Sequence, residues 1–487
     1  MADVGMTTGP VDPGPETKAA SPATQHTRLA RGVLSNLDIA TSTMANIAPA
    51  MSFFFGFGLV ASTAGVPAPL TIIAAMIAIA LLGNTLTQFS RVHPSTGSFV
   101  TFIGRAFGPY MAVLMALVLS AGYITAVASV VGISGGWTSD ILRVYLHIHI
   151  PWQILTFVLV SIALALIVRG AAVSTKAAAI FFTFELGLMM IIAIALLIKH
   201  GGSLNLHPFD PGRLSGGFSG LSLGFPLAIY MFIGWENSAA LAEESEDPRV
   251  GIGKAILWSI LLLGGSYILF AYTTVISFGE NIGLLSQASV PFVTAAHQVS
   301  SVLAFFAYIA GFTSIFGTLL SAANSQARII FNSGREGLLP SWVSRVTRES
   351  RTPYAAFIVY LGIALGLTYI FGWSQPPVLY FGEIGTMGTI LVIVTYLVAN
   401  LALPVYFRRH HPELFHPIKH LLLPLLGAFA VGYPLYELVK PGQPKPFSIY
   451  PLIAIGVIVV AGVWAAIVNA RDRTLGERVG SIVADAD

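Results

Sequence analysis

The sequence contains no cysteine, and only 10% of its 487 residues are charged. The absence of cysteine excludes disulfide bonds, thiol catalysis and cysteine metal sites, although it does not fix the cellular compartment. A soluble domain carries about 25% charged residues, so this chain falls well outside that class. The formal net charge of +3 is spread over many segments, and the basic stripe that nucleic-acid binding requires is absent.

Apolar sequence is what the chain has in excess, with 55% hydrophobic residues and a mean hydropathy of +0.78. A bilayer core of about 30 Å needs about 20 apolar residues per helix. Many runs of that length occur between short polar turns. We therefore predict an all-α integral membrane protein with 12 transmembrane helices, over residues 39–62, 69–90, 106–133, 151–168, 177–198, 220–241, 255–278, 298–326, 354–372, 379–403, 420–439 and 447–469.

The distribution of Lys and Arg predicts the orientation, because cytoplasmic loops carry an excess of both. One set of alternate segments holds 20 of the 25 basic residues, and the opposite set holds the other five: Arg143, Lys199, Arg213, Lys440 and Lys445. Since twelve is even, both termini are predicted to lie in the cytoplasm of a multi-pass cell-membrane protein. The N-terminal segment lacks the layout of a cleaved signal peptide and is predicted to be a disordered tail.

Two predicted spans contain features that a lipid-facing helix would avoid. In the first, around Asn46–Met51, Pro49 removes a backbone donor at a cost of about 3 kcal/mol in a helix interior. The sixth places Gly234 and Glu236 in mid-membrane. Helices broken at corresponding positions of two halves indicate a transporter site, where freed amides hold an anion and freed carbonyls a cation. An amino acid matches both ends; the alternative is two kinked helices that only pack.

Three motifs resemble those of the amino acid–polyamine–organocation permease superfamily. The strongest is Phe232-Ile233-Gly234-Trp235-Glu236, followed by Ala242-Glu243-Glu244, Asp247-Pro248 and Lys254-Ala255-Ile256. The others are Ala327-Arg328 through Arg335-Glu336-Gly337-Leu338-Leu339-Pro340, and Pro94-Ser95-Thr96-Gly97-Ser98 with Gly108. The resemblance covers residues 33 to 470 approximately. It implies a leucine-transporter-like 5+5 inverted repeat with broken helices 1 and 6 and two peripheral helices.

The same resemblance implies the division of the chain and the substrate contacts. It divides the chain into a tail (1–32), a first repeat (33–200), a second repeat (201–403), the two peripheral spans (404–470) and a cytoplasmic C-terminal tail (471–487). Expected substrate contacts are Asn46, Ile47, Ala48, Ala50, Met51, Tyr230, Phe232, Ile233, Gly234 and Trp235. The family usually has Gly-Ser-Gly at the first break, whose amides hold the substrate carboxylate. Pro49 has no amide, which leaves room for a decarboxylated amine.

Three carboxylates fall inside predicted spans, where a charge costs at least about 2.5–3.5 kcal/mol and should face a cavity or be protonated. Glu185 is predicted to exchange a proton during transport, or else to tie spans together by hydrogen bonds. Glu236 is either a pH-sensitive group beside the substrate or, in the preferred interpretation, a cap for the second half-helix. Glu383 is expected to line an entrance. Paired hydroxyls at Thr313 and Ser314 offer a sodium site as the rival mechanism.

The sequence therefore predicts a secondary transporter of amino acids or related amines, working by proton-coupled uptake and alternating access. The alternatives are a polyamine or amine exchanger and a non-transporting nutrient sensor. Enzyme activity is not expected, because no His-Glu-x-x-His or comparable metal set occurs, and a channel would need a pore loop or a charged ring. No cofactor or metal is expected. The predicted partners are the substrate, protons or, as the rival, sodium, and the lipid bilayer.

Overall fold

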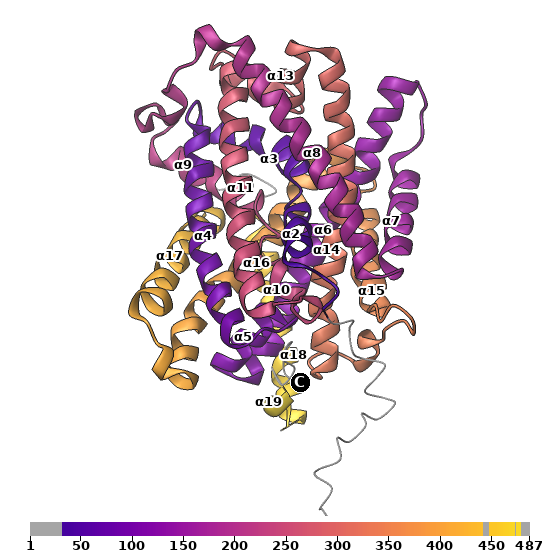
Figure 1. Cartoon of the computed structure of the whole chain (residues 1–487), viewed down its shortest axis with the longest axis vertical. Helices are drawn as coiled ribbons and strands as arrows, with labels where there is room; N and C mark the ends of the chain where they lie inside the picture. Colours follow the sequence, from indigo (N-terminus) through magenta and orange to yellow (C-terminus); the bar gives the residue numbers. More distant parts are fainter. Residues whose placement is uncertain (1–31, 442–447, 473, 479–487) are drawn as a thin grey trace, which may run out of the picture.

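A computed structural model describes residues 32–441, 448–472 and 474–478, and within these ranges the regular structure is helical, with no strand. The tail predicted over residues 1–32 lies outside the described residues except for its last residue, and so does most of the predicted tail 471–487. The long helices run close to the long axis of the molecule and form one bundle (Figure 1).

Nine helical segments of the described chain are long and apolar enough to cross a membrane. They are α2 with α3 (Asn36–Ile47 and Pro49–Ala64), α4 (Ala68–Val92), α6 (Pro109–Leu146), α8 (Ala171–Lys199), α11 (Pro248–Ser277), α14 (Ser301–Arg335), α15 (Tyr354–Gly372), α16 (Pro377–His410) and α18 (Tyr450–Arg471). The prediction of an all-helical, multi-pass membrane protein is confirmed. Three other predicted spans fall on shorter helices, α7 (Trp152–Val168), α9 (Phe218–Tyr230) and α17 (Leu423–Val439), so the number twelve stays a prediction.

Short helices lie between the long ones and, in one case, after the last of them, and the hydropathy pattern did not distinguish them from the predicted spans. They are α5 (Ser98–Phe107), α10 (Asn237–Ala240), α12 (Ile282–Gln287), α13 (Pro291–Val299) and α19 (Leu475–Arg478), together with the single turns η1 (Gly201–Ser203), η2 (His207–Phe209), η3 (Pro211–Arg213), η4 (Ala242–Glu244), η5 (Ser341–Ser344), η6 (Pro412–Leu414) and η7 (Ile418–Leu422). The third span also runs further than predicted, to Leu146. Polar residues near its C-terminal end lower the hydropathy, whereas the helix continues to Leu146 and ends at His147, which has a left-handed φ of 56°.

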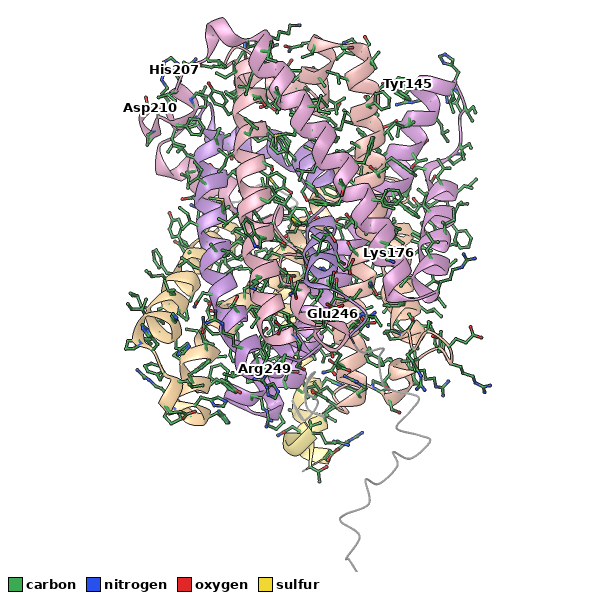
Figure 2. The ribbon with its side chains drawn as sticks, in the orientation of Figure 1. Tyr145, Lys176, His207, Asp210, Glu246 and Arg249 are labelled. Atoms are coloured by element: carbon green, nitrogen blue, oxygen red, sulfur yellow. The ribbon has the colours of Figure 1, made fainter. Side chains whose placement is uncertain are left out.

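In the most apolar 18-residue stretch of α6, 78% of the residues are buried, whereas in that of α18 only 17% are. The core of the bundle is therefore built around α6. The closest helix pairings are α6 with α16, α4 with α11, and α14 with α8. The two ends of the bundle differ in their residues: His207 and Asp210 lie at the upper end of Figure 2 and Arg249 at the lower end. We call the lower end the basic end, because the Lys- and Arg-rich segments of the sequence belong to it.

Candidate functional site

The first predicted break lies at a single residue, Ala48, which ends α2 and precedes Pro49 at the start of α3. Ala48 has φ 55°, a left-handed conformation that costs a residue with a Cβ about 1–2 kcal/mol. Side chains satisfy the backbone groups that the break sets free. The N–H of Ala50 donates to Glu185 Oε2 (3.4 Å), and the N–H of Met51 donates to Ser314 Oγ (3.0 Å).

The second break replaces helix by successive turns over residues 231–236, between α9 and α10. Gly234, with φ 113°, donates its N–H to Glu236 Oε2 (3.0 Å), and the Tyr123 hydroxyl donates to Glu236 Oε1 (2.6 Å). Both oxygens of the Glu236 carboxylate are therefore engaged, and the side chain makes no capping hydrogen bond to α10. The capping interpretation of Glu236 is wrong, because the carboxylate turns back to the amide of Gly234.

The two breaks lie against each other in the middle of the bundle. A Cβ on Gly234 would lie 2.4 Å from Asn46 Nδ2, so glycine is what lets the second break approach the first. One turn closer to the basic end, Thr43 Oγ1 and Ser238 Oγ share a hydrogen bond of 2.8 Å between α2 and α10. The two interruptions thus form one structural unit.

A small buried cavity of about 40 Å³ lies beside this unit. Its lining combines both breaks with α6, α14 and α16: Asn46, Ile47, Met51, Ser52, Ala126, Val127, Val130, Tyr230, Ile233, Thr318, Ala322, Gln326 and Phe381. Asn46 is 4% exposed, and neither atom of its amide has a hydrogen-bond partner. A buried amide normally finds a partner, so Asn46 offers a donor and an acceptor to whatever occupies the cavity.

Of the ten predicted substrate contacts, Asn46, Ile47, Met51, Tyr230 and Ile233 line the cavity. Tyr230 shares a hydrogen bond of 2.9 Å with Ser129 Oγ, and its ring centroid lies 5.9 Å from that of Phe381. The other five, Ala48, Ala50, Phe232, Gly234 and Trp235, are outside the lining.

Among the five residues outside the lining, Trp235 has the best-defined surroundings. It is fully buried, with ring centroids 5.6 Å from Tyr396 and 6.2 Å from Phe99. Phe232 packs against Tyr267, with centroids 5.4 Å apart. Both aromatic rings therefore pack against other rings of the bundle and lie outside the cavity lining.

Sequence reasoning missed the contribution of α14, where Thr318, Ala322 and Gln326 face the cavity at intervals of four residues. Ser314 lies four residues before them and contacts the first break. Small and polar residues at this interval lie on one face of a helix. This pattern in the sequence could have indicated that α14 contributes to the cavity. Thr313, the other half of the predicted sodium site, donates its hydroxyl hydrogen to Ala310 O on its own helix.

Glu383 lies apart from this cavity. It lines a lateral groove of about 500 Å³ between α6, α15, α16 and α18, together with Tyr380 and Tyr450. Across the described ranges, no three His, Asp or Glu side chains gather in a way that could hold a metal ion.

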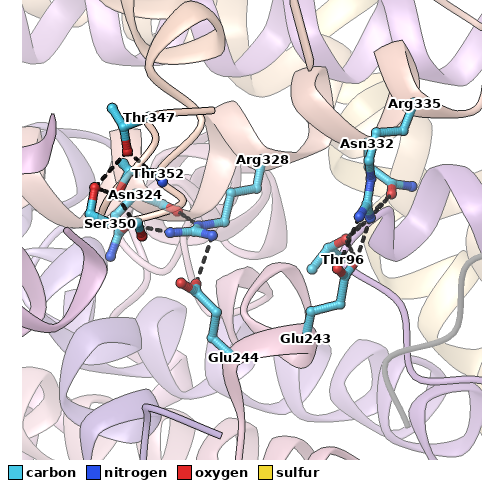
Figure 3. A network of polar contacts seen from close by, with 10 residues as sticks. All are labelled: Thr96, Glu243, Glu244, Asn324, Arg328, Asn332, Arg335, Thr347, Ser350 and Thr352. Atoms are coloured by element: carbon cyan, nitrogen blue, oxygen red, sulfur yellow. Dashed lines mark hydrogen bonds and ion pairs between the residues drawn. The ribbon is translucent and has the colours of Figure 1, made fainter. Parts of the chain in front are cut away.

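Two ion pairs join α14 to η4 at the basic end (Figure 3). Arg328 Nη1 lies 2.6 Å from Glu244 Oε2, and Arg328 Nη2 donates to Asn324 Oδ1 (2.8 Å). Arg335 Nη1 donates to Glu243 Oε2 (3.0 Å). Thr96, which precedes α5, donates its hydroxyl hydrogen to Glu243 Oε1 (2.7 Å). These contacts join α14, η4 and the segment before α5 to one another.

A second polar cluster ties the loop before α9 to Glu280, just beyond the end of α11. Asn205 Nδ2 donates to Glu280 Oε1 (2.7 Å), His207 Nδ1 lies 3.1 Å from the same oxygen, and Arg213 Nη1 lies 3.7 Å from Glu280 Oε2. Partial burial acts to raise the pKa of Glu280, but the contacts with Asn205 and His207 and the charge of Arg213 outweigh it. The pKa is therefore lowered from its ordinary value of 4.5.

Comparison with known proteins places this arrangement in a family. The family model described as amino acid permease matches residues 34–469, and the chain belongs to that family. The chain is therefore a multi-pass membrane permease and not an enzyme.

Three relatives illustrate the range of the family. A branched-chain amino acid permease of Bacillus subtilis is 24% identical over 82% of this chain and 86% of its own length. A gamma-aminobutyric acid permease of Escherichia coli is 23% identical over 87% and 92%, respectively. The human cystine/glutamate transporter is 26% identical over 80% and 76%. The relatives' names support amino acid transport, but they differ in substrate.

Proposed function

We propose that this permease is a secondary active transporter for amino acids or related amines, working by proton-coupled uptake and alternating access. The observation that carries the proposal is the unpaired, buried amide of Asn46 in a cavity where the two helix breaks meet. A volume of about 40 Å³ holds water but not an amino acid. A cavity of this size fits a transporter conformation that must rearrange before substrate enters.

The proposal includes the finer architecture inferred from the sequence. Twelve spans, with 33–200 and 201–403 as inverted repeats and 404–470 as two peripheral helices, place the breaks in corresponding spans 1 and 6. The excess of Lys and Arg supports a basic end that faces the cytoplasm, with both termini on that side. In that orientation the Arg328–Glu244 and Arg335–Glu243 pairs act as a cytoplasmic closure.

Glu185 is the group we propose for proton coupling. It is 1% exposed, and its carboxyl group contacts the amide of Ala50 at the first break. Protonation of this oxygen would remove its acceptor charge and loosen α3 from α8, which links proton binding to the shape of the cavity. Sodium coupling through Thr313 and Ser314 is the rival, and Ser314 already accepts from Met51 N.

Uptake into proteoliposomes tests the function. The purified chain is reconstituted, and the uptake of labelled amino acids and of their decarboxylated amines is measured with an inward proton gradient or with a sodium gradient. We expect accumulation of at least one substrate class that needs the proton gradient. Binding without accumulation would refute transport and support a sensor.

Two variants connect the assay to the site. Asn46→Ser should raise KM, whereas Asn237→Ser is the matched control, because Asn237 is equally buried and unpaired but lies outside the cavity lining. Glu185→Gln should flatten the pH dependence of uptake, with Glu383→Gln, in the lateral groove, as its control. A Glu185→Gln variant with the normal pH profile would remove Glu185 from the coupling mechanism.

A further inference from the structure

A groove at the basic end lies outside the site described above, on the surface between α4 and α11. Its volume is about 570 Å³. The lining residues come from these two helices and from no other: Ala80, Gly83, Asn84, Thr87, Arg91, Arg249, Val250, Gly253, Lys254, Ile256, Leu257 and Ile260. Three of them are cationic and none carries a carboxylate.

The charges gather at one end of the groove. Arg91 lies in the last turn of α4, and Arg249 and Lys254 lie in the first two turns of α11. All three side chains are exposed. Arg249 Nη1 donates to the carbonyl oxygen of Arg91 (2.9 Å), which holds its guanidinium across the gap between the two helices.

Two acidic residues, Asp247 and Glu246, also lie near this end, outside the groove lining. Asp247 accepts a hydrogen bond from Val250 N (3.3 Å) and so faces the start of its own helix. Glu246 is exposed and precedes α11. Asn84, which also lines the groove, donates its Nδ2 hydrogen to the backbone carbonyl oxygen of Lys419 (2.7 Å) and so joins α4 to η7.

The opposite end of the groove is apolar. Ala80 on α4 and Ile260 on α11 each lie eleven residues from the arginine at the charged end of their helix, which is about 16 Å along the axis. That length is about half the thickness of a bilayer core. Leu257 in the lining and its neighbour Trp258 outside it are 53% and 64% exposed, so this part of α11 lies on the apolar surface of the bundle.

We propose that this groove binds an anionic phospholipid, with the phosphate between Arg91, Arg249 and Lys254 and an acyl chain along Leu257 and Ile260. Basic pockets between transmembrane helices at the cytoplasmic surface bind anionic headgroups. Here the cations, the apolar wall and the depth of one leaflet occur in a single concave surface. A lipid in this position joins α4 to α11, and its binding is independent of whether the chain transports a solute.

The test uses the full chain in nanodiscs of phosphatidylcholine with increasing phosphatidylglycerol, with the thermal midpoint as the measurement. Phosphatidylglycerol should raise the midpoint by on the order of a few degrees. The double variant Arg91→Gln/Lys254→Gln should lose most of that shift. The matched control Arg345→Gln/Arg348→Gln also removes two exposed cations from the basic end, outside the groove, and should keep it.

Three outcomes would overturn the proposal. Equal loss of the shift in both double variants would indicate a general charge effect. The same stabilisation by inorganic phosphate in pure phosphatidylcholine nanodiscs would indicate a site for a soluble anion. The third outcome does not depend on how well a variant folds: a photoreactive phosphatidylglycerol on the unmodified chain should crosslink to residues 80–91 and 249–260, and crosslinks confined to other helices would contradict the assignment.

Discussion

Replacing Glu244 by glutamine should destabilise the protein far more than replacing an acid in an ion pair of equal length at the surface. Arg328 and Glu244 lie 2.6 Å apart with side chains 0% and 4% exposed, whereas Arg143 and Asp140 lie 2.6 Å apart with side chains 58% and 47% exposed. Glu244→Gln leaves a buried guanidinium without its partner, at a cost of about 3–5 kcal/mol. Asp140→Asn should cost about 0–1 kcal/mol, because water and salt screen an exposed pair.

The assay is the free energy of reversible unfolding in mixed micelles, measured for both single variants and for Arg328→Met/Glu244→Gln. Removing both charges of a buried pair is often neutral or even stabilising, so the double variant should recover most of the loss. If Glu244→Gln and Asp140→Asn lowered the free energy of unfolding equally, the reasoning would be refuted, because the distance within the ion pair and not its burial would then determine the loss of stability. A double variant no better than Glu244→Gln would also contradict it.

Three further predictions concern backbone strain and one titrating group. Gly234→Ala should abolish uptake and lower the thermal midpoint, because its Cβ would meet the Asn46 amide at 2.4 Å; Gly265→Ala, with open space around its Cβ, should change neither. Ala48→Gly should stabilise the protein by about 1 kcal/mol in unfolding measurements, by relieving the left-handed φ of 55°. The lowered pKa of Glu280 stabilises the fold above pH 4.5 and ceases to do so as the pH falls through the native pKa. The thermal midpoint should therefore fall more steeply below about pH 4.5 in the unmodified chain than in Glu280→Gln.

The positions of both breaks could be predicted from the sequence because each contains a residue with a specific backbone effect. Pro49 has no N–H, and its ring prevents a continuous helix, so α2 ends just before it. Gly234 adopts φ 113°, which is accessible to glycine without strain. These effects are local, and a single sequence contains the information.

The remainder of the cavity could not be predicted, because its lining depends on which helix faces meet. Ala126, Val127 and Val130 of α6 are apolar and follow no pattern that separates them from residues facing lipid or other helices. Trp235 was expected at the substrate for its chemistry, yet the turn before it directs the ring towards Tyr396. Side-chain direction after a break depends on the turn geometry, which periodicity does not contain.

The first break also bears on the chemistry of the substrate. Pro49 has no N–H, and the amides of Ala50 and Met51 donate to Glu185 and Ser314, so none of these three residues has an amide free for a carboxylate. A hydrogen bond to a charged group contributes about 1.5–3 kcal/mol, so a clamp of two would make a carboxylate-free analogue bind about 10²–10⁴-fold more weakly. With these amides already engaged, the site we propose has the Asn46 amide and the Tyr230 ring for substrate recognition, beside the polar side chains of Ser52, Thr318 and Gln326 in the same lining. An amide pairs with ammonium and carboxylate alike, and an aromatic face attracts a cation, which is why amines belong in the uptake panel beside amino acids.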